Sequence, residues 1–237
     1  MKDVRNTLNT LNIGQVLLSS DFHVVGLNDY AQRLFSPILR ELGESIFRCH
    51  SRKSRERVAA LLQELTSAPS DMPRTMVLDV LGKVVMFNLS QLSVGSSRPQ
   101  TFWSVTLIDI SEQTGAVTNP LSGAIEMRRF PVFSEGIYHF LPTDAVHSIQ
   151  SDGDYCKIFT PGKSYYLHSS LKNILQRFTG ASFFRVHKCF VVNLDHVSKL
   201  TRDGKGHTLI MFDDASIPPV PVSRRRLAEV RKAMHIR

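Results

Sequence analysis

Residues 183–193 read FFRVHKCFVVN, in which two apolar runs flank the polar side chains of Arg185, His187 and Lys188. The stretch belongs to a second half of the chain where short alternating runs follow one another with turn residues between them. Further runs are VHSIQSDGDYCKIFT at 146–160, PGKSYYLH at 161–168 and HVSKLTRDGKGHTLIMFDD at 196–214. This pattern indicates antiparallel strands, so we expect the second half to be mostly β.

Two helices are expected among these strands. The stretch SSLKNILQRF at 169–178 begins with a pair of serines that can cap a helix. Its apolar residues at 171, 174, 175 and 178 are spaced for one buried face. The stretch SRRRLAEVRKAM at 223–234 has a helical period and closes the chain with a basic segment.

Positive charge is concentrated in this half. The chain has 237 residues, with 29 Lys and Arg against 21 Asp and Glu, which gives a net charge of +8. Residues 120–237 carry 17 basic and 10 acidic side chains, whereas residues 1–119 carry 12 and 11. A basic surplus favours an anionic partner such as nucleic acid or a membrane surface. The anion-binding residues are therefore expected in the second half.

Four segments of the second half resemble the LytTR DNA-binding domain of bacterial transcription regulators. They are FLPTDAVHSIQSDGDYCKIFT at 140–160, YLHSSLKNILQRF at 166–178, SFFRVHKCFVVNLDHVSKL at 182–200 and IPPVPVSRRRLAEVRKAM at 217–234. The most specific pieces are FFRVHKCFVVN and PVSRRR. The resemblance implies a mostly β domain over 131–237 that places loops, in place of a recognition helix, into successive major grooves.

The resemblance also implies which residues contact double-stranded DNA. Affinity for DNA comes largely from neutralising phosphates with Lys and Arg, while base reading needs donors that reach the base edges. The implied residues are Asp154 and Tyr155 in one loop, Arg185, His187 and Lys188 in a second, and Ser223, Arg224 and Arg225 in a third. We expect Lys188 and Arg224 to contribute most.

Several of these residues also have a purely structural interpretation. His187 can be a buried hydrogen-bonding group instead of a phosphate contact, and Tyr155 can belong to the core. The basic residues Arg226, Arg231 and Lys232 can form the solvated face of the last helix. Asn193 is expected to serve the turn after its strand, because Asn bonds its own backbone readily.

The first half mixes strand and helix signals. Apolar runs at 16–18 and 23–27 are separated by Ser19-Ser20-Asp21, which predicts a hairpin. Asn28 can cap a short helix after it. An apolar spacing of three and four over 51–65 predicts a longer helix. Strand-like stretches at 75–92 and 101–110 complete an α+β order with a largely antiparallel sheet.

This order and two motifs resemble a PAS domain, a sensory module that holds its ligand between a five-stranded sheet and a set of helices. The motifs are VLLSSDFHVVGLNDYAQRLF at 16–35 and LIDISEQ at 107–113. We therefore expect two domains, a PAS sensor over 10–112 and a LytTR domain over 131–237, with an unrelated α+β fold as the alternative for the first. Residues 113–130 hold two Gly, one Pro and little periodicity, which predicts a linker.

His50 is the candidate ligand-binding residue of the first domain. It precedes the apolar stripe of the helix predicted over 51–65, so its imidazole can lie on the pocket side and bind iron. Met76 lies on the facing strand, and His with Met is an axial pair of haem iron. The chain thus resembles the carbon-monoxide-responsive regulators that join a haem PAS domain to a LytTR domain. That resemblance implies haem b as cofactor and CO or another diatomic gas as the sensed ligand.

Other interpretations of the first domain stay open. Met72 and Met86 are alternatives to Met76 as the second iron ligand. The chain lacks a Pro after His50 and a Cys before Met76, two residues expected from those regulators. The domain can instead bind another small molecule, or bind no ligand and serve dimerisation.

The remaining features argue against an enzyme, a secreted protein and a membrane protein. Motifs of hydrolases, P-loop proteins, zinc proteases and kinases are absent. No stretch approaches the roughly 20 apolar residues of a membrane span, the first residues lack the apolar core of a signal peptide, and the three cysteines show no metal spacing. We expect a cytoplasmic homodimer that binds repeated DNA sites.

Overall fold

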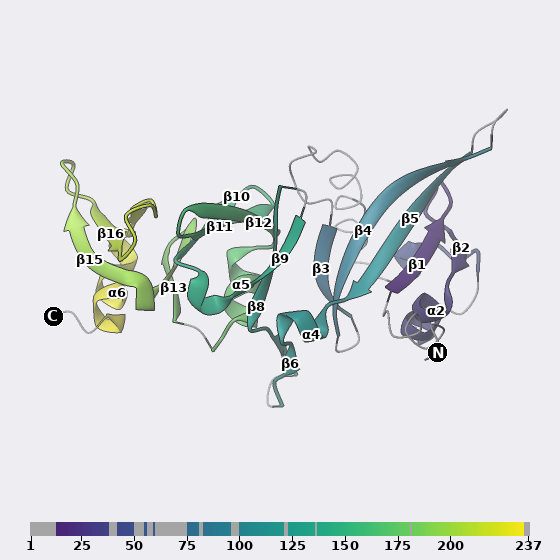
Figure 1. Cartoon of the computed structure of the whole chain (residues 1–237), viewed down its shortest axis with the longest axis horizontal. Helices are drawn as coiled ribbons and strands as arrows, with labels where there is room; N and C mark the ends of the chain where they lie inside the picture. Colours follow the sequence, from purple (N-terminus) through teal and green to yellow (C-terminus); the bar gives the residue numbers. More distant parts are fainter. Residues whose placement is uncertain are drawn as a thin grey trace, which may run out of the picture. The chain divides into compact units, whose positions relative to one another are not determined.

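The computed structural model divides the chain into two compact units, Met1–Ser111 and Glu112–Arg237. Each unit has its own sheets and its own core, and strands dominate both (Figure 1). The structure describes residues 13–37, 42–49, 55, 59, 75–80, 83–95, 100–120, 123–135, 137–180 and 182–234. Most of the helix predicted over 51–65, and His50 before it, therefore lie outside the described residues.

The first unit is built on a five-stranded antiparallel sheet with the order β2-β1-β5-β4-β3. Its strands are β1 (Ile13–Leu18), β2 (Val24–Leu27), β3 (Thr75–Val80), β4 (Lys83–Val94) and β5 (Gln100–Asp109). Helix α2 (Asp29–Phe35) and the 3-10 turn η1 (Ile46–Cys49) follow β2 in the chain. The predicted hairpin and the largely antiparallel sheet are confirmed.

Helix α2 begins as the sequence predicts and packs on one face of this sheet. The Asn28 side chain accepts a hydrogen bond from Ala31 N, which satisfies one of the free amides of the first turn. Ala31, Leu34 and Phe35 are buried against strand residues of the sheet. Gly14 permits this close approach, because a Cβ there would lie 2.8 Å from Leu107 Cδ1. We call the face under α2 the inner face.

Neighbouring residues of β4 alternate between the inner face and the opposite face. Val85 belongs to the buried cluster under α2, and Phe87 packs against that cluster. Met86 stands between them and pairs with Val77 of β3 and with Ile108 of β5. The Met86 side chain is therefore directed to the opposite face of the sheet, although it is buried.

Residues 112–130 differ from the predicted linker. They contain helix α4 (Ser111–Thr114), which begins at the last residue of the first unit, and strands β6 (Val117–Thr118) and β7 (Ile125–Glu126), which pair with each other. Ile125, Met127 and Phe130 are buried, and Met127 N donates to Arg177 O. The segment is thus part of the second unit. Its apolar residues are too few and too irregularly spaced to give a periodic signal.

The second unit contains a seven-stranded antiparallel sheet and a three-stranded one. The large sheet has the order β13-β14-β10-β11-β12-β8-β9, and the small sheet the order β15-β16-β17. The strands of the large sheet are β8 (Arg129–Ser134), β9 (Ile137–Pro142), β10 (Ser148–Asp152), β11 (Tyr155–Thr160), β12 (Lys163–His168), β13 (Phe183–His187) and β14 (Phe190–Asn193). Those of the small sheet are β15 (Val197–Arg202), β16 (Thr208–Phe212) and β17 (Val220–Pro221).

Short helices connect these strands. Helix α5 (Leu171–Arg177) is capped by Ser170, whose side chain accepts from Asn173 N. The chain ends in η4 (Arg224–Arg226) and α6 (Leu227–Ala233), and the turns η2 (Thr143–Ala145) and η3 (Leu194–His196) precede β10 and β15. The mostly β character expected for this half is confirmed. Among the described residues, none of the helices has the length and apolar character of a membrane span.

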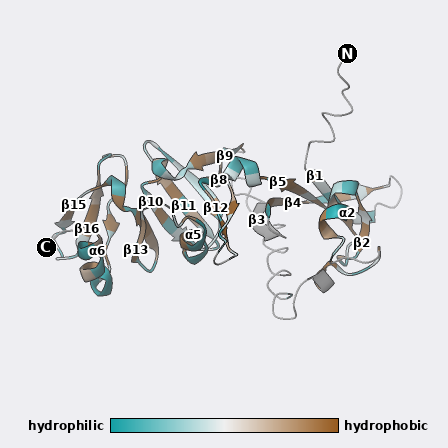
Figure 2. Cartoon of the chain, turned by 90° about the horizontal axis from the view of Figure 1, so that it is seen from below, coloured by the Kyte–Doolittle hydropathy of each residue, from teal (hydrophilic) through white to brown (hydrophobic). Residues whose placement is uncertain are grey.

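Two cores hold the second unit together. One joins the two sheets and α6 through Val186, Val192, Ile210 and Val230, all fully buried. Phe130 of β8 anchors the other side, because its ring stacks on Phe178 at the end of α5 with centroids 3.7 Å apart. Hydrophobic colours follow the strands, while α6 carries hydrophilic ones as well (Figure 2).

We predict that Phe130→Ala lowers the free energy of unfolding of the second unit by about 3–5 kcal/mol, the usual cost of removing a buried phenyl ring. Urea unfolding of the full chain followed by circular dichroism measures this change. Ile137→Ala is the control, because that side chain is 60% exposed and its removal should cost under about 0.5 kcal/mol. Equal effects of the two substitutions would contradict the assigned core.

Candidate functional site

The three loops predicted to contact DNA lie in the second unit as surface turns. The first is the β10–β11 turn with Asp154, the second the β13–β14 turn with Lys188, and the third the segment that leads into η4 with Arg224 and Arg225. These four side chains are exposed, while Tyr155, Arg185, His187 and Ser223 are half-buried.

Two backbone hydrogen bonds join the three turns into one surface. Ser151 N, just before the first turn, donates to Cys189 O of the second at 2.9 Å. Ser223 N of the third segment donates to Val186 O of the second at 3.0 Å. The β13–β14 turn is thus the central one, because it is bonded to both of the other segments, although up to about 70 residues separate the three in the chain.

The β13–β14 turn has an irregular register. Arg185 pairs with Val191 and His187 pairs with Phe190, so Val186 is an extra residue on β13. A β-bulge of this kind re-aims the side chains next to it. Here it buries Val186 in the core while Lys188 projects into solvent.

Two side chains brace this turn from within. The Arg185 guanidinium donates from Nη2 to Lys188 O at 2.7 Å and from Nε to His187 O at 3.4 Å. His187 Nδ1 accepts from Cys189 N at 3.2 Å. A neutral imidazole has one donor and one acceptor nitrogen, so the proton of a neutral His187 is on Nε2. His187 thus accepts a hydrogen bond within the turn through Nδ1, as in the structural interpretation, and its Nε2–H does not take part in that bond.

The third segment presents a run of arginines at the start of α6. Arg224 and Arg225 are exposed in η4, and Ser223 precedes them as its N-cap. Arg226 is held by Glu229, with Nη1 3.3 Å from the carboxylate. Farther along α6, Arg231 and Lys232 are exposed. The ion pair of Arg226 therefore agrees with its interpretation as part of the solvated face of the last helix. Arg224 and Arg225 directly follow Ser223, which is bonded to β13 beside the central turn.

Local interactions explain the conformation of the β10–β11 turn and the position of Asn193. Gly153 has φ of 58°, a left-handed conformation that the tight β10–β11 turn uses and that glycine adopts without strain. Tyr155 lies edge-on to His168 with centroids 5.2 Å apart, so its ring is part of the sheet surface. Asn193 caps η3 by accepting from Asp195 N, which confirms its expected role in the turn.

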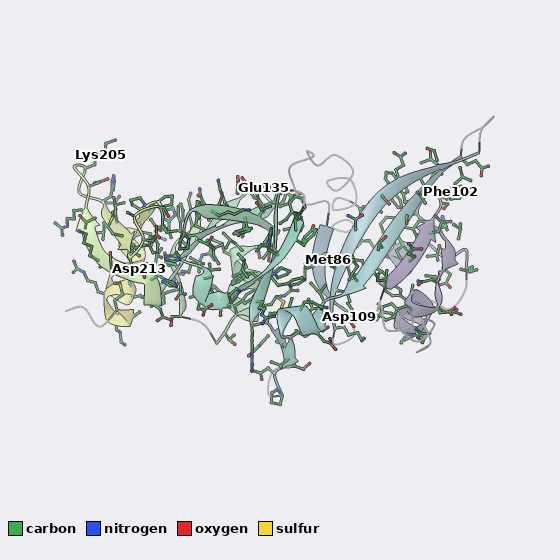
Figure 3. All side chains as sticks on the ribbon, in the orientation of Figure 1. Met86, Phe102, Asp109, Glu135, Lys205 and Asp213 are labelled. Atoms are coloured by element: carbon green, nitrogen blue, oxygen red, sulfur yellow. The ribbon has the colours of Figure 1, made fainter. Side chains whose placement is uncertain are left out.

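A second polar cluster lies at the junction of the two sheets and was not anticipated. Asp213, labelled in Figure 3, follows β16 and lies 3.0 Å from His147 Nε2 and 3.1 Å from His196 Nδ1. The other nitrogens of the two rings lie next to backbone carbonyls, that of His147 next to Ala145 O and that of His196 next to Asp144 O. No sequence pattern indicates the cluster, because His147 and Asp213 are 66 residues apart.

The three ligand atoms of this cluster lie within 4.8 Å of one another, so metal binding has to be considered. The two imidazoles are stacked, with centroids 3.8 Å apart and planes at 15°. A ring nitrogen binds zinc in the ring plane at about 2.0–2.1 Å. Because the rings of His147 and His196 are stacked and nearly parallel, a single ion cannot lie in both ring planes. The geometry therefore fits hydrogen bonds from the two rings to one carboxylate.

The charges of this cluster follow from its contacts. Burial by itself lowers the pKa of His196, but the hydrogen bonds to Asp213 and to the Asp144 carbonyl, with the charge of Asp213, raise it overall. Burial works to raise the pKa of Asp213, and the hydrogen bonds and charges of His196 and His147 lower it overall. These shifts favour the imidazolium form of His196 and the carboxylate form of Asp213, and the contact between them joins η3 to the end of β16.

In the first unit, aromatic side chains gather on the inner face near η1. Phe22 stacks on Trp103 with centroids 6.1 Å apart and meets Phe47 of η1 edge-on at 5.8 Å. Leu89 and Val105 pack against these rings. Phe22 has φ of 64°, a conformation that is rare for bulky residues. The result is an apolar surface of flat rings next to the turn that precedes His50 in the chain.

The predicted iron ligands lie partly outside the described residues. His50 is not described, and of Met76 only the backbone is, in β3. Met76 pairs with Phe87, a residue that packs against the inner-face cluster. Met86, labelled on β4 in Figure 3, is directed to the face opposite the one on which Phe87 and the aromatic rings lie. Met72 is outside the described residues.

A network around Asp109 closes the same unit at the end of β5. Lys83 Nζ lies 2.7 Å from Asp109 Oδ2, Tyr30 OH donates to the same oxygen at 3.2 Å, and Ser111 Oγ donates to Oδ1 at 2.6 Å. Burial works to raise the pKa of Asp109, but the hydrogen bonds from Lys83 and Ser111 lower it overall. The motif LIDISEQ thus ties α2, β4 and the last residue of the unit together.

The family of the second unit is shown by sequence. Residues 137–235 match the family described as LytTr DNA-binding domain. This part of the chain is therefore a DNA-binding domain of the LytTR family, and the three joined turns belong to it. A solved LytTr DNA-binding domain of a methyl-accepting/DNA response regulator from Bacillus cereus is 20% identical, covers 45% of this chain and 96% of its own, and superposes with a TM-score of 0.41.

Relatives of the whole chain are transcriptional regulators. The chain is 23% identical over 248 residues to the haem-containing CO-sensing transcriptional regulator RcoM 2 of Paraburkholderia xenovorans, covering 98% of this chain and 92% of the relative. It is 25% identical over 241 residues to the CO-responsive transcriptional regulator RcoM of Rhodospirillum rubrum, covering both chains completely. The similarity thus extends over the first unit as well as the DNA-binding domain.

We predict that the His196–Asp213 pair makes the stability of the second unit depend on pH. The raised pKa of His196 contributes stability below its unfolded value of about 6.5, and this is lost as pH rises through the folded value. The lowered pKa of Asp213 contributes above about 3.8 and is lost as pH falls. The pair therefore contributes most between about pH 4 and 6.5.

Urea unfolding of wild type and Asp213→Asn at pH 5.5 and pH 8 measures this contribution. We expect the difference in unfolding midpoint between the two proteins to be larger at pH 5.5. Asp154→Asn is the matched control, because that carboxylate is exposed in a turn. An equal difference at both pH values would show that the pair is not charged as assigned.

Proposed function

We propose that the protein is a transcription regulator that binds specific DNA through its LytTR domain and senses a ligand through its first unit. The observation that carries the DNA-binding part is the joining of three turns of the LytTR domain into one surface that bears Lys188, Arg224 and Arg225. Phosphate neutralisation by such cations supplies affinity, and donors in the same surface can reach base edges.

Each predicted contact residue has a role that its chemistry supports. Lys188 is an exposed point charge on the central turn and suits a phosphate. Arg224 and Arg225 carry planar forks that suit guanine or phosphate. Asp154 repels phosphate but can accept from the amino group of cytosine. Ser223 and Tyr155 can donate from their hydroxyls, and His187 from Nε2.

The first unit is proposed to be a PAS domain that senses carbon monoxide or another diatomic gas at haem b. Its five-stranded antiparallel sheet with helix α2 on one face has the expected layers. The aromatic surface of Phe22, Phe47 and Trp103 suits a flat, largely apolar macrocycle. The related regulators named above are described as CO-sensing or CO-responsive.

His50 and Met76 are the residues proposed to hold the iron. His50 directly follows η1, whose Phe47 is part of the aromatic surface. Met76 has its register position opposite Phe87. When bound, haem would supply an iron centre that can take a diatomic gas as a ligand, and His50 and Met76 would hold that iron. The protein supplies the imidazole and thioether and, through the aromatic rings, a surface that excludes water.

Ligand binding can control DNA binding only if the ligand has different affinities for two states of the protein. We propose that these states differ in how a homodimer presents its two LytTR domains to repeated DNA sites, and that the protein works in the cytoplasm and not as an enzyme. The Asp109 network connects the sheet and α2 of the first unit to Ser111, the last residue before the second unit.

A second candidate function is favoured by apolar side chains that are exposed on the opposite face of the sheet. The first unit can be a PAS module that binds no haem and serves dimerisation or binds another small molecule. The opposite face of its sheet favours the dimerisation form, because Leu92, Val94 and Ile108 are exposed there. The haem experiment below separates the two candidates.

We predict that Arg224→Ala weakens binding to a specific duplex by about 1–3 kcal/mol, the value of one bidentate base contact. Lys188→Ala should lower the slope of log affinity against log salt by about one, because one phosphate contact is lost. Fluorescence anisotropy with a duplex selected by the wild-type protein from a random pool measures both. Lys172→Ala, exposed on α5, is the control and should bind like wild type. Wild-type affinity of both test variants would refute the assigned surface.

We predict that the full-length protein from haem-supplemented cells shows a Soret band that shifts after reduction and again with carbon monoxide. His50→Ala should lose bound haem, because the imidazole is the proposed iron ligand. Met76→Leu should alter the reduced spectrum, whereas Met86→Leu, on the opposite face of the sheet, should not. A colourless wild-type protein that still binds DNA would support the second candidate function instead.

A further inference from the structure

Arg185 occupies a special place in the DNA-binding surface. It lies on β13, the edge strand of the seven-stranded sheet, immediately before the bulge at Val186. Its side chain is half-buried, whereas the Lys188 side chain three residues later is exposed. The sequence alone makes both residues candidates for contact with DNA, and the structure gives them different surroundings.

The guanidinium of Arg185 is directed to the backbone of its own turn. Nη2 lies 2.7 Å from Lys188 O, and Nε lies 3.4 Å from His187 O. These two nitrogens form one edge of the planar fork, an edge that could otherwise hold a phosphate or a guanine in bidentate fashion. Because this edge is used within the protein, only the Nη1 end is directed elsewhere.

The contacts of Arg185 complete a set that fixes the three carbonyls of the turn. His187 O and Lys188 O accept from Arg185, and Cys189 O accepts from Ser151 N. Val186 O, at the bulge, accepts from Ser223 N. The peptide groups on both sides of Lys188 are thus held by donors from other parts of the surface.

We propose that Arg185 is a positioning residue for DNA binding, which acts through Lys188 and His187 and does not itself read or grip the DNA. It holds the carbonyls of the turn, so that the Lys188 ammonium and the His187 Nε2–H are presented together toward the nucleic acid. Because the turn is already ordered before DNA binds, less conformational entropy is lost on binding and the affinity is higher. The inference rests on the proposed DNA-binding function.

The chemistry of arginine explains why lysine would not serve. A guanidinium offers several N–H groups in a rigid plane and can bond two carbonyls at once. A lysine ammonium is a flexible point charge, which can neutralise a phosphate but cannot reproduce the two-carbonyl brace. Arg185→Lys therefore keeps the charge that a DNA contact needs and removes the geometry that a brace needs.

The test compares DNA binding of full-length wild type, Arg185→Lys, Arg185→Ala, Lys188→Ala and the double variant Arg185→Ala/Lys188→Ala. The probe is a duplex selected by the wild-type protein from a random pool. Arg231→Ala, which removes an exposed arginine of α6, is the control for loss of one positive charge. Affinity is measured over a series of salt concentrations, and thermal unfolding is recorded for every variant.

We expect Arg185→Lys and Arg185→Ala to lose affinity to a similar extent, about tenfold or more, as for other hydrogen bonds from a charged donor. In the Lys188→Ala background the further loss from Arg185→Ala should be smaller, because only the part of its effect that acts through His187 is left. Arg185→Lys should keep the wild-type salt slope.

Two results would overturn the inference. Wild-type affinity of Arg185→Lys would identify Arg185 as a simple charge contact, and losses that multiply in the double variant would show that it acts independently of Lys188. If wild type selects no duplex, the proposed function itself fails and the inference fails with it. If it selects one, the Arg185 variants decide the inference alone.

Hydrogen exchange without DNA provides a second measurement that does not depend on affinity. Loss of the brace should speed amide exchange in the peptide that covers 186–190, in Arg185→Lys as in Arg185→Ala. Peptides from α5 and β8 should be unchanged. Wild-type exchange of the turn in both variants would show that Arg185 does not hold it, even if a variant unfolds at a lower temperature.

Discussion

The backbone hydrogen bonds to Val186 O and Cys189 O are the constraint on which the DNA-binding surface depends. Each connects the β13–β14 turn to a segment distant in sequence, Ser223 in one case and Ser151 in the other. The bulge at Val186 makes the first bond possible, because it places the carbonyl at the edge of the sheet while its side chain is buried in the core. Without these bonds Asp154, Lys188 and Arg224 would be three unrelated surface residues.

The two sheets of the second unit are held by apolar and polar contacts of different kinds. Val186, Ile210 and Val230 give the non-directional part of the contact. The carboxylate of Asp213 gives the directional part, since it bridges His147 and His196 from strand connections on either side. The arginines of η4 are positioned by the small sheet and α6, so the geometry of this junction also determines where Arg224 lies relative to Lys188.

The local structure of the chain was largely predictable, because it depends on neighbours in sequence. Asn28 and Ser170 cap helices as expected, and the alternating runs of the second half form antiparallel strands. The burial of Ile125, Met127 and Phe130 in the segment predicted as a linker was not visible in the sequence, because it depends on contacts with α5 and leaves no periodic pattern in so short a segment. The hydrogen bonds from Arg185 to His187 O and Lys188 O were missed for another reason, since residue type and spacing do not show which backbone atoms a side chain contacts.

The sequence by itself determined most of the strands of the second half, the helix caps and the location of positive charge in that half, since these follow from residue type and spacing. Tertiary structure alone decided which cations lie together, that Phe87 and not Met86 is on the inner face of the sheet, and that Asp213 meets two histidines. The physical reason is that hydrogen bonds and packing between distant segments depend on strand register, and a shift of one residue in register reverses the side on which every side chain lies.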